Sequence, residues 1–276
     1  MTNAPLPTRV TLVTFSATGN TRRVGRLLLD SLCEAWGAVG LRVDITTPAA
    51  RQRELCFGPE DFVLFGVPVY AGRVPNRLLP FFREKLRADG TPAAAFVTYG
   101  GRGVDDALGE LGALLTEDGL RVTAGAAIPA EHAFSARVQG GRPDAEDRTS
   151  LYSFALALAQ KQREGRCEPV ELPCPGGAKG YYTPLREDAA AADFLSVRPT
   201  TELSLCEGCC LCASVCPEGS VSRTDPTEST GLCIHCMACV RRCPRGARSF
   251  DSEDFRSHVA WLERHATARP PVWTWL

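Results

Sequence analysis

The sequence of 276 residues lacks an excess of charge of either sign: Lys and Arg total 31, Asp and Glu total 32, and the formal net charge is −1. Proteins dedicated to nucleic acids carry a strong basic excess, so we expect neither DNA nor RNA as a partner. The sequence also lacks an apolar run near the roughly 18 residues of a membrane span, and its start lacks the pattern of a signal peptide. We therefore expect a cytoplasmic protein without a membrane span.

Cysteine is scarce in the first 205 residues and dense after them. Nine of the thirteen cysteines fall between residues 206 and 243. Disulfides are rare in a reducing compartment, so this density indicates a metal-binding region. The other four are isolated: Cys33, Cys56, Cys167 and Cys174. We expect the first two to pack in a hydrophobic core and the last two to be surface thiols.

The region before the cysteines alternates between apolar runs and helical patterns. The predicted strands cover residues 10–15, 41–46, 62–67, 93–99 and 121–128, and the predicted helices cover 22–36, 77–87, 104–117 and 145–162. The apolar runs do not alternate with polar residues, which is typical of strands buried on both faces of a parallel sheet. We therefore predict an α/β fold, with a doubly wound, five-stranded parallel sheet and helices on both faces.

Composition divides the chain into four parts. Residues 1–165 would form the sheet domain, and residues 166–200, which are broken by proline and glycine, a linker along the surface. Residues 201–250 would form a small cysteine-rich domain. In residues 251–276 the spacing predicts a helix over 253–265, followed by an extended tail.

The cysteine-rich region contains one motif twice. C-x2-C-x2-C-x3-C-P occurs in residues 206–217 and again in 233–244, an offset of 27 residues that indicates an internal repeat. A [4Fe-4S] cubane needs four thiolates; the compact loop supplies three, and the fourth cysteine reaches the neighbouring cluster. We expect two such clusters with crossed ligands: Cys206, Cys209, Cys212 and Cys243 for one, and Cys233, Cys236, Cys239 and Cys216 for the other.

Zinc is the alternative occupant, because paired C-x2-C units bind zinc in many small domains. Zinc sites do not require an evenly spaced third cysteine or a following proline, so we favour iron and sulfur. Cys210 directly follows Cys209. If Cys210 were the second ligand, the loop would be poorly shaped for three corners of a cubane, so we expect it to be a free thiol.

A loop rich in hydroxyl groups follows the first predicted strand and leads into the first helix. Backbone N–H groups, hydroxyls and a helix N-terminus together favour an anion such as phosphate. The loop has neither a Walker A motif nor G-x-G-x-x-G, and a plain helix cap is the alternative interpretation. Its residues are Ser16, Ala17, Thr18, Gly19, Asn20 and Thr21.

The residues SATGNT of this loop resemble the phosphate-binding loop of flavodoxins, and the two cysteine motifs resemble bacterial two-cluster ferredoxins. The first resemblance implies FMN, bound at the carboxyl ends of the strands. Two glycine-rich loops would flank its isoalloxazine ring, with Tyr70 stacked on the ring. These loops are Pro68, Val69, Tyr70, Ala71, Gly72 and Arg73 after the third strand, and Tyr99, Gly100, Gly101, Arg102 and Gly103 after the fourth.

Taken together, these motifs are similar to the EFR1 family of flavodoxin and ferredoxin fusions, over nearly the whole chain. The resemblance implies a flavodoxin-like sheet domain, a small α+β dicluster ferredoxin domain, FMN, two [4Fe-4S] clusters and electron transfer. Its partner would be a redox protein, such as a ferredoxin or a reductase. Two alternatives stay open: a flavin-dependent reductase of a small organic molecule or quinone fed through the clusters, and a non-catalytic redox or iron sensor. A homodimer is compatible with the sequence.

Three residues bear on the choice between carrier and reductase. His132 follows the fifth predicted strand and is the candidate proton donor beside the flavin, with a purely structural histidine as the alternative. Arg73 and Arg102 lie in the two ring-flanking loops, where a guanidinium would favour the anionic reduced flavin and raise its potential. The alternative is that both side chains point to solvent or pair with a carboxylate. The nearby candidates are Asp105, Asp106 and Glu131.

Overall fold

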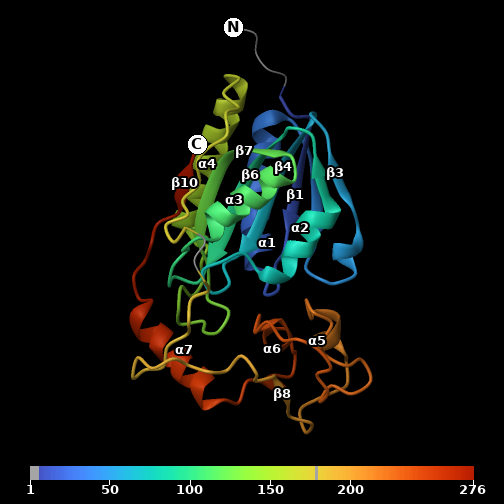
Figure 1. Ribbon diagram of the computed structural model, residues 1–276, viewed down its shortest axis with the longest axis vertical. Helices are drawn as coiled ribbons and strands as arrows, with labels where there is room; N and C mark the ends of the chain where they lie inside the picture. The colour runs from blue at the N-terminus through green and yellow to red at the C-terminus, as the bar shows by residue number, and fades with distance from the viewer. Residues whose placement is uncertain (1–5, 178–179) are drawn as a thin grey trace.

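The computed structural model describes residues 6–177 and 180–276, and its main feature is a six-stranded sheet with helices on both faces (Figure 1). Five of the strands are parallel: β1 (Arg9–Thr14), β2 (Val39–Asp44), β4 (Asp61–Pro68), β6 (Thr91–Tyr99) and β7 (Leu120–Pro129). Their order across the sheet is β7-β6-β4-β1-β2, which is the doubly wound order of the flavodoxin-like fold. The predicted α/β fold class is confirmed.

Two hydrophobic cores lie on the two faces of the sheet. Leu64 and Phe65 are consecutive residues of β4 and point to opposite faces, where Leu64 belongs to the core that contains Leu28 and Phe65 to the core that contains Phe82. This is why the central strands β4 and β6 are buried along almost their whole length, whereas β2 at the edge of the sheet is mostly exposed. The helices of the first face are α1 (Asn20–Trp36) and α4 (Ala145–Arg163), and those of the second are α2 (Leu79–Lys85) and α3 (Ala107–Glu117).

The sixth strand comes from the far end of the chain. β10 (Trp273–Trp275) pairs antiparallel with β7, with Thr274 opposite Ala126. The tail is extended, as expected, but it also joins the sheet as an edge strand, which the prediction of five strands did not include. Trp275 packs against the core on the α3 side, so apolar burial accompanies the backbone pairing.

The predicted helix over residues 77–87 is shorter in the structure. A 3-10 turn, η2 (Asn76–Leu78), precedes α2, and residues 86–88 form strand β5 (Leu86–Ala88) instead of a last helical turn. β5 pairs in parallel with β3 (Leu55–Phe57), and Leu55 lies opposite Leu86 with both side chains buried. This pairing also makes the prediction for Cys56 wrong, because it points outward from β3 and is exposed. A further 3-10 turn, η1 (Ala50–Gln52), precedes β3.

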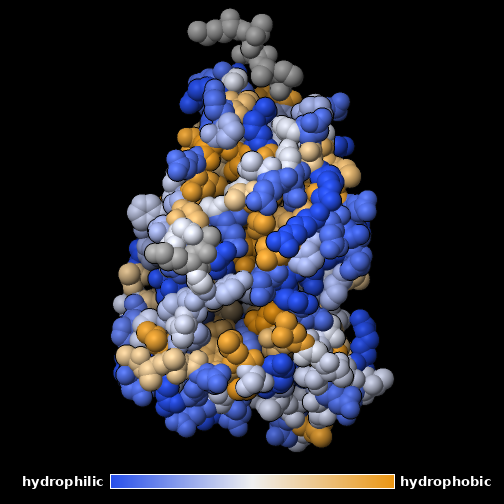
Figure 2. Space-filling view, in the orientation of Figure 1, coloured by the Kyte–Doolittle hydropathy of each residue, from blue (hydrophilic) through white to orange (hydrophobic). Residues whose placement is uncertain are grey.

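The C-terminal part lies below the sheet in Figure 1. A third hydrophobic core contains Phe194 of the linker together with Met237, Phe250 and Phe255. Phe134 from the loop after β7 packs against this core and joins the C-terminal part to the sheet domain. Figure 2 shows apolar side chains gathered around this junction. The elements here are β8 (Thr200–Thr201), α5 (Leu211–Ser214), α6 (Ala238–Arg241), β9 (Arg248–Ser249) and α7 (Glu253–His265).

Helix α7 has the bounds that the sequence predicts. Ser252 precedes it, and its hydroxyl oxygen accepts a hydrogen bond from the backbone N–H of Phe255 at 3.3 Å, which satisfies a donor of the first turn. Phe255 and Leu262 are buried. Within residues 6–177 and 180–276, no helix combines the length and the apolar character needed to cross a membrane.

Candidate functional site

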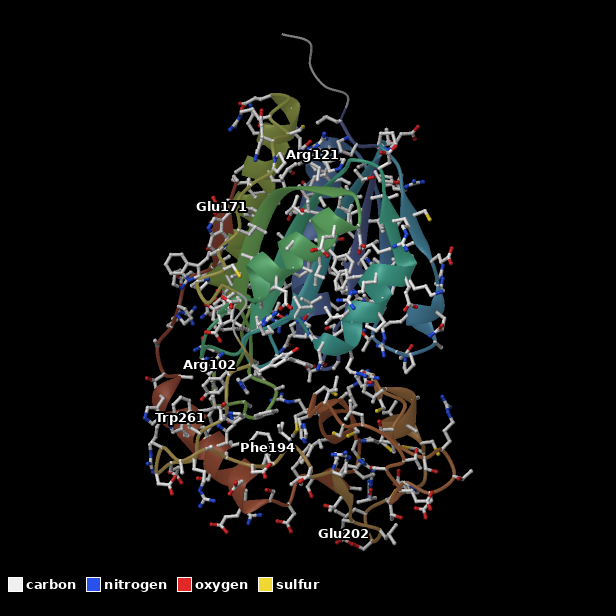
Figure 3. All side chains as sticks on the ribbon, in the orientation of Figure 1. Arg102, Arg121, Glu171, Phe194, Glu202 and Trp261 are labelled. Atoms are coloured by element: carbon white, nitrogen blue, oxygen red, sulfur yellow. The ribbon has the colours of Figure 1, made fainter. Side chains whose placement is uncertain are left out.

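A cavity of about 220 Å³ lies between the carboxyl ends of the parallel strands and the C-terminal part. The loops after β1, β4, β6 and β7 form one side of it, and the linker and α7 form the other. Figure 3 shows Arg102 on the sheet side of this junction and Phe194 on the other. The predicted site residues that line the cavity are Ala17, Thr18, Asn20, Thr21, Pro68, Val69, Tyr70, Ala71, Gly72, Tyr99, Gly100, Arg102, Gly103 and His132.

Four of the predicted residues lie outside this lining: Ser16, Gly19, Arg73 and Gly101. The Ser16 hydroxyl oxygen accepts a hydrogen bond from the backbone N–H of Arg22 at 3.0 Å, so it serves the first turn of α1. Gly19 precedes α1 with a φ of 102°, a left-handed conformation that favours glycine. A side chain at position 101 would meet Gln139 rather than the cavity.

The loop after β1 brings two kinds of donor to the cavity. The first N–H groups of α1 have no intrahelical acceptor, and Thr18 adds a hydroxyl beside them. The Thr21 hydroxyl is engaged elsewhere, because its Oγ1 atom lies 2.7 Å from Oγ1 of Thr98 in a buried hydrogen bond. Asn20 Nδ2 donates to the backbone oxygen of Glu131 at 2.9 Å, which ties this loop to the loop after β7. The arrangement suits an anion at this end of the cavity.

The loop after β4 contains a tight hairpin turn from Tyr70 to Arg73. The backbone N–H of each residue donates to the oxygen of the other, at 2.9 and 3.0 Å, and Ala71 and Gly72 both have positive φ, as in a type I′ turn. The Tyr70 ring lines the cavity and meets Phe15 edge-on, with ring centroids 6.3 Å apart. Burial raises the pKa of Tyr70 well above its usual range, so the side chain is a neutral phenol.

The two arginines of the ring-flanking loops lie in different surroundings. Arg73 binds Glu110 of α3 through two hydrogen bonds of 2.8 and 2.7 Å, and it does not line the cavity. Arg102 lines the cavity, pairs with Asp105, and places its guanidinium 3.9 Å from the ring centroid of Tyr182. Arg102 is therefore the one of the two that can act on a ligand.

His132 is held as a neutral imidazole. Its Nδ1 atom accepts a hydrogen bond from the backbone N–H of Phe134 at 3.0 Å, which leaves the ring proton on Nε2. Burial lowers the pKa of His132 to about 4, and the positive charges of His258, Arg241 and Arg102 act in the same direction. The ring can donate a hydrogen bond to a ligand through Nε2–H, but it is not an imidazolium at neutral pH.

The far wall of the cavity was missed by the sequence analysis. It consists of residues from the linker, the second cysteine motif and α7: Tyr182, Pro184, Phe194, Leu195, Ile234, His235, His258 and Leu262. Most of them are apolar or aromatic, and the four from the linker come from a segment without regular patterning. The linker, with Tyr181, Tyr182 and Phe194, is about as rich in aromatic residues as the whole chain (8%), so its composition gives no signal for this wall.

The backbone of the two cysteine motifs repeats as the sequence does. Positive φ angles occur at equivalent positions in both halves. The pairs are Gly208 (68°) with His235 (52°), Cys210 (55°) with Met237 (62°), and Gly219 (64°) with Gly246 (63°). Each half then forms a four-residue helix, α5 or α6. The two loops thus have one shape despite different side chains.

Each half also donates a backbone hydrogen bond to its last cysteine. The N–H of Ser220 lies 3.3 Å from Cys216 Sγ, and the N–H of Ala247 lies 3.3 Å from Cys243 Sγ. Hydrogen bonds to sulfur stabilise a thiolate ligand. Burial raises the pKa of Cys236 and Cys239 above that of an ordinary thiol, so an apolar pocket alone would keep them protonated and bound iron would be needed to hold them as thiolates.

Two small cavities separate the eight cysteines into two sets. A cavity of about 30 Å³ is lined by Cys216, Cys233, Cys236 and Cys239, and we call it the inner cysteine cavity. A cavity of about 20 Å³ is lined by Cys206, Cys209, Cys212 and Cys243, together with Cys210, and we call it the outer cysteine cavity. In each, one cysteine comes from the other half of the repeat, and the residues present fit a crossed pair of four-thiolate sites.

Cys210 occupies the position that Met237 has in the second half, between the second and third cysteines of the motif. Its thiol donates to the backbone oxygens of Arg223 and Gly208, at 3.0 and 3.4 Å.

Among the described residues, no group of three or more His, Cys, Asp or Glu side chains lies close enough together to hold a single metal ion.

Ile234 connects the two kinds of site. It lies between Cys233 and Cys236 in the second motif, and it lines both the large cavity and the inner cysteine cavity. The outer cysteine cavity shares no lining residue with the large cavity. The inner cysteine cavity therefore adjoins the large cavity.

Comparison with known proteins identifies the second cysteine motif. Residues 226–249 match the family described as "4Fe-4S binding domain", and this stretch includes Cys233, Cys236, Cys239 and Cys243. The chain therefore contains an iron-sulfur binding domain at this place. No curated protein matches the sequence.

Solved structures of flavodoxin type are similar to the sheet domain. One is a flavodoxin from the domain Archaea, with 16% identity and a TM-score of 0.42, which covers 56% of this chain and 98% of its own. Another is oxidised flavodoxin 2 from Bacillus cereus, with 19% identity and a TM-score of 0.41, which covers 55% of this chain and 99% of its own. Rubredoxin oxygen:oxidoreductase from Desulfovibrio gigas is similar over 58% of this chain and 37% of its own, with 15% identity and a TM-score of 0.39. The fold assignment rests on the strand order given above.

Proposed function

We propose that this protein is an iron-sulfur flavoprotein, in which two [4Fe-4S] clusters and FMN exchange electrons within one chain and with a redox protein. FMN accepts or releases one or two electrons and each cluster one, which is the chemistry that these groups supply when bound. The observation that carries the proposal is the position of Ile234, which lines the large cavity and the inner cysteine cavity together. The proposed flavin and cluster sites are thus adjacent at Ile234.

The residues of the large cavity have distinct roles in this proposal. Thr18 and the first N–H groups of α1 bind the phosphate of FMN, while the Tyr70 turn and the loop over residues 99–103 enclose the isoalloxazine ring. Gly100 allows close approach of the His132 ring to the loop. The linker and α7 partly cover this cavity, and the lower local dielectric strengthens the electrostatic contacts inside it.

The eight cysteines would hold the clusters in the two sets described above. The outer set contains Cys209, which is exposed, whereas Cys236 and Cys239 of the inner set are buried. We therefore place the contact with the partner protein at the outer set, with a ferredoxin or a reductase as donor or acceptor. The chain would in this respect resemble the EFR1 family, and its place in the cytoplasm and a homodimer remain predictions.

Anaerobic purification with elemental analysis tests the proposal directly. We expect about eight irons and eight sulfides per chain, as two cubane clusters require, with non-covalent FMN released on denaturation. Two zinc ions per chain, or a flavin other than FMN, would contradict it. The direction of electron flow is tested by mixing the protein with a reduced ferredoxin as electron donor. Absorbance then shows whether the flavin is reduced through the clusters.

The second candidate function is a flavin-dependent reductase of a small organic molecule or quinone. It is favoured by the far wall of the large cavity, where Tyr182, Phe194 and His258 give an aromatic, enclosed surface suited to a planar molecule. Steady-state turnover with a series of quinones distinguishes the two candidates. A carrier would react with redox proteins at least as fast as with any small acceptor, whereas a reductase would prefer the small molecule.

A further inference from the structure

Arg248 in β9 is a buried cation without an acidic partner. Its exposed fraction is 3%, and none of the ion pairs among the described residues involves it. Its terminal nitrogens donate to three neutral oxygens: Thr201 Oγ1 at 2.8 Å, the backbone oxygen of Pro226 at 2.6 Å and that of Pro199 at 3.4 Å. Its Nε atom is buried and has no hydrogen-bond partner.

Such an arrangement is costly unless negative charge lies nearby. A buried charge without a partner is strongly unfavourable, and a lone buried donor adds a further penalty. Cysteines that become negative as cluster ligands line the cavities beside it. Arg248 lines the outer cysteine cavity, and it donates to the backbone oxygen of Pro199, which lines the inner one.

The internal repeat shows that the cation is specific to one half. Val221 stands 27 residues before Arg248 and is the equivalent residue of the first half. It lines the inner cysteine cavity, as Arg248 lines the outer one, and it is also buried. The fold therefore accepts an aliphatic side chain at this position, and the backbone shape does not explain the arginine.

We propose that Arg248 is a positive charge shared by the two cluster sites, which compensates the negative charge of both clusters and raises the reduction potential of each. The proposal rests on the proposed function, because it needs two clusters. One-electron reduction adds one negative charge to a cluster, and a fixed cation nearby stabilises the added charge. Because Arg248 lines the outer cavity and donates to Pro199 of the inner one, its charge also reduces the repulsion between two reduced clusters.

The test is a redox titration of the anaerobically purified holoprotein, with dithionite as reductant and paramagnetic resonance as the readout of each cluster. Arg248→Gln removes the charge and keeps a hydrogen-bonding side chain, and Arg248→Lys keeps the charge. Arg245→Gln is the matched control, because Arg245 lines the same outer cavity but is exposed and paired with Glu207.

We expect Arg248→Gln to shift both cluster potentials to more negative values, Arg248→Lys to stay near the parent protein, and Arg245→Gln to shift less than Arg248→Gln. Unchanged potentials in Arg248→Gln at full iron content would overturn the proposal, as would equal shifts in the glutamine and lysine variants. If Arg248→Gln loses its clusters, the lysine variant decides: full iron content with unshifted potentials supports a role of charge, and loss of the clusters there too overturns it. Absence of iron in the parent protein would instead refute the proposed function.

Discussion

Gly100 and His132 lie so close together that a Cβ atom at position 100 would overlap the imidazole ring. Gly100 belongs to the loop after β6 and His132 to the loop after β7, so this contact fixes the spacing of two loops that line the large cavity. The absence of a side chain at position 100 is thus a condition for the shape of the proposed flavin site.

We expect Gly100→Ala to weaken FMN binding about 5-fold to 150-fold, which corresponds to the roughly 1–3 kcal/mol of overpacking in a filled site. Titration of the protein with FMN, followed by flavin fluorescence, measures this. Gly100→Ala combined with His132→Ala is the control, because it removes the ring that the new methyl group meets. Affinity in the single variant equal to that of the parent would contradict the close contact.

The loop after β1 allows its hydroxyl groups to be tested one at a time. Thr18→Val should weaken FMN binding about 10-fold or more, because a hydrogen bond to a charged group contributes roughly 1.5–3 kcal/mol. Thr21→Val should instead lower the free energy of unfolding by about 1–3 kcal/mol, since it leaves the buried Thr98 hydroxyl without its partner. If Thr18→Val binds FMN as the parent protein does, the loop is only a helix cap.

The pH dependence of stability reports the state of His132. Its pKa of about 4 in the folded protein lies below the ordinary value near 6.5, so folding disfavours the protonated form. The stability contribution is complete above pH 6.5 and is lost as the pH falls towards 4, by about 3 kcal/mol in total. His132→Gln should reduce this loss, measured as the difference in urea midpoint between pH 7.5 and 5.5. An identical difference in both proteins would show that His132 does not titrate in this way.

The two arginines of the ring-flanking loops should affect the flavin differently. Arg102→Gln should lower the potential of the one-electron couple that forms the anionic hydroquinone by about 60 mV or more, which corresponds to the loss of one pKa unit of charge stabilisation. Arg73→Gln should leave the potential unchanged and destabilise the fold, because Arg73 binds Glu110 instead of facing the cavity. Spectroscopic redox titration of both variants decides, and a shift of equal size in the two would show that the cavity lining does not explain the potential.

Crossed ligation predicts different results for two cysteines of the first motif, Cys210 and Cys216. Cys216→Ala should damage the cluster site of Cys233, Cys236 and Cys239 and spare the site formed by its own half, whereas Cys210→Ala should leave both intact. Iron content and paramagnetic resonance of each reduced variant measure this. Loss of a cluster in Cys210→Ala would mean that the motif is offset by one residue.

The sheet and α7 could be predicted because their patterns are local. Buried parallel strands leave continuous apolar runs, and α7 has both a capping serine and helical spacing. The last turn of the predicted helix over residues 77–87 could not be foreseen, because Leu86 forms a strand with Leu55, more than thirty residues earlier. Pairing partners at such separation leave no mark on the local sequence.

The candidate site divides in the same way. Cysteine spacing is a local signal, and it predicted the two sets of cysteines that line the separate cavities. The position of Arg73 depends on Glu110 of α3, and the far wall depends on how the linker folds back with Tyr182 and Phe194. These contacts arise only from the tertiary arrangement, so neither composition nor periodicity contains them.

The pairing of β10 with β7 has a consequence for chain connectivity. Because Trp273 to Trp275 return to the sheet, the iron-sulfur region is an insertion between two strands of one sheet and not a pendant tail. Both of its ends are anchored, by α4 on one side and β10 on the other. These two anchors limit how far the region can move away from the sheet, and so they restrict changes in the distance between the large cavity and the cysteine cavities.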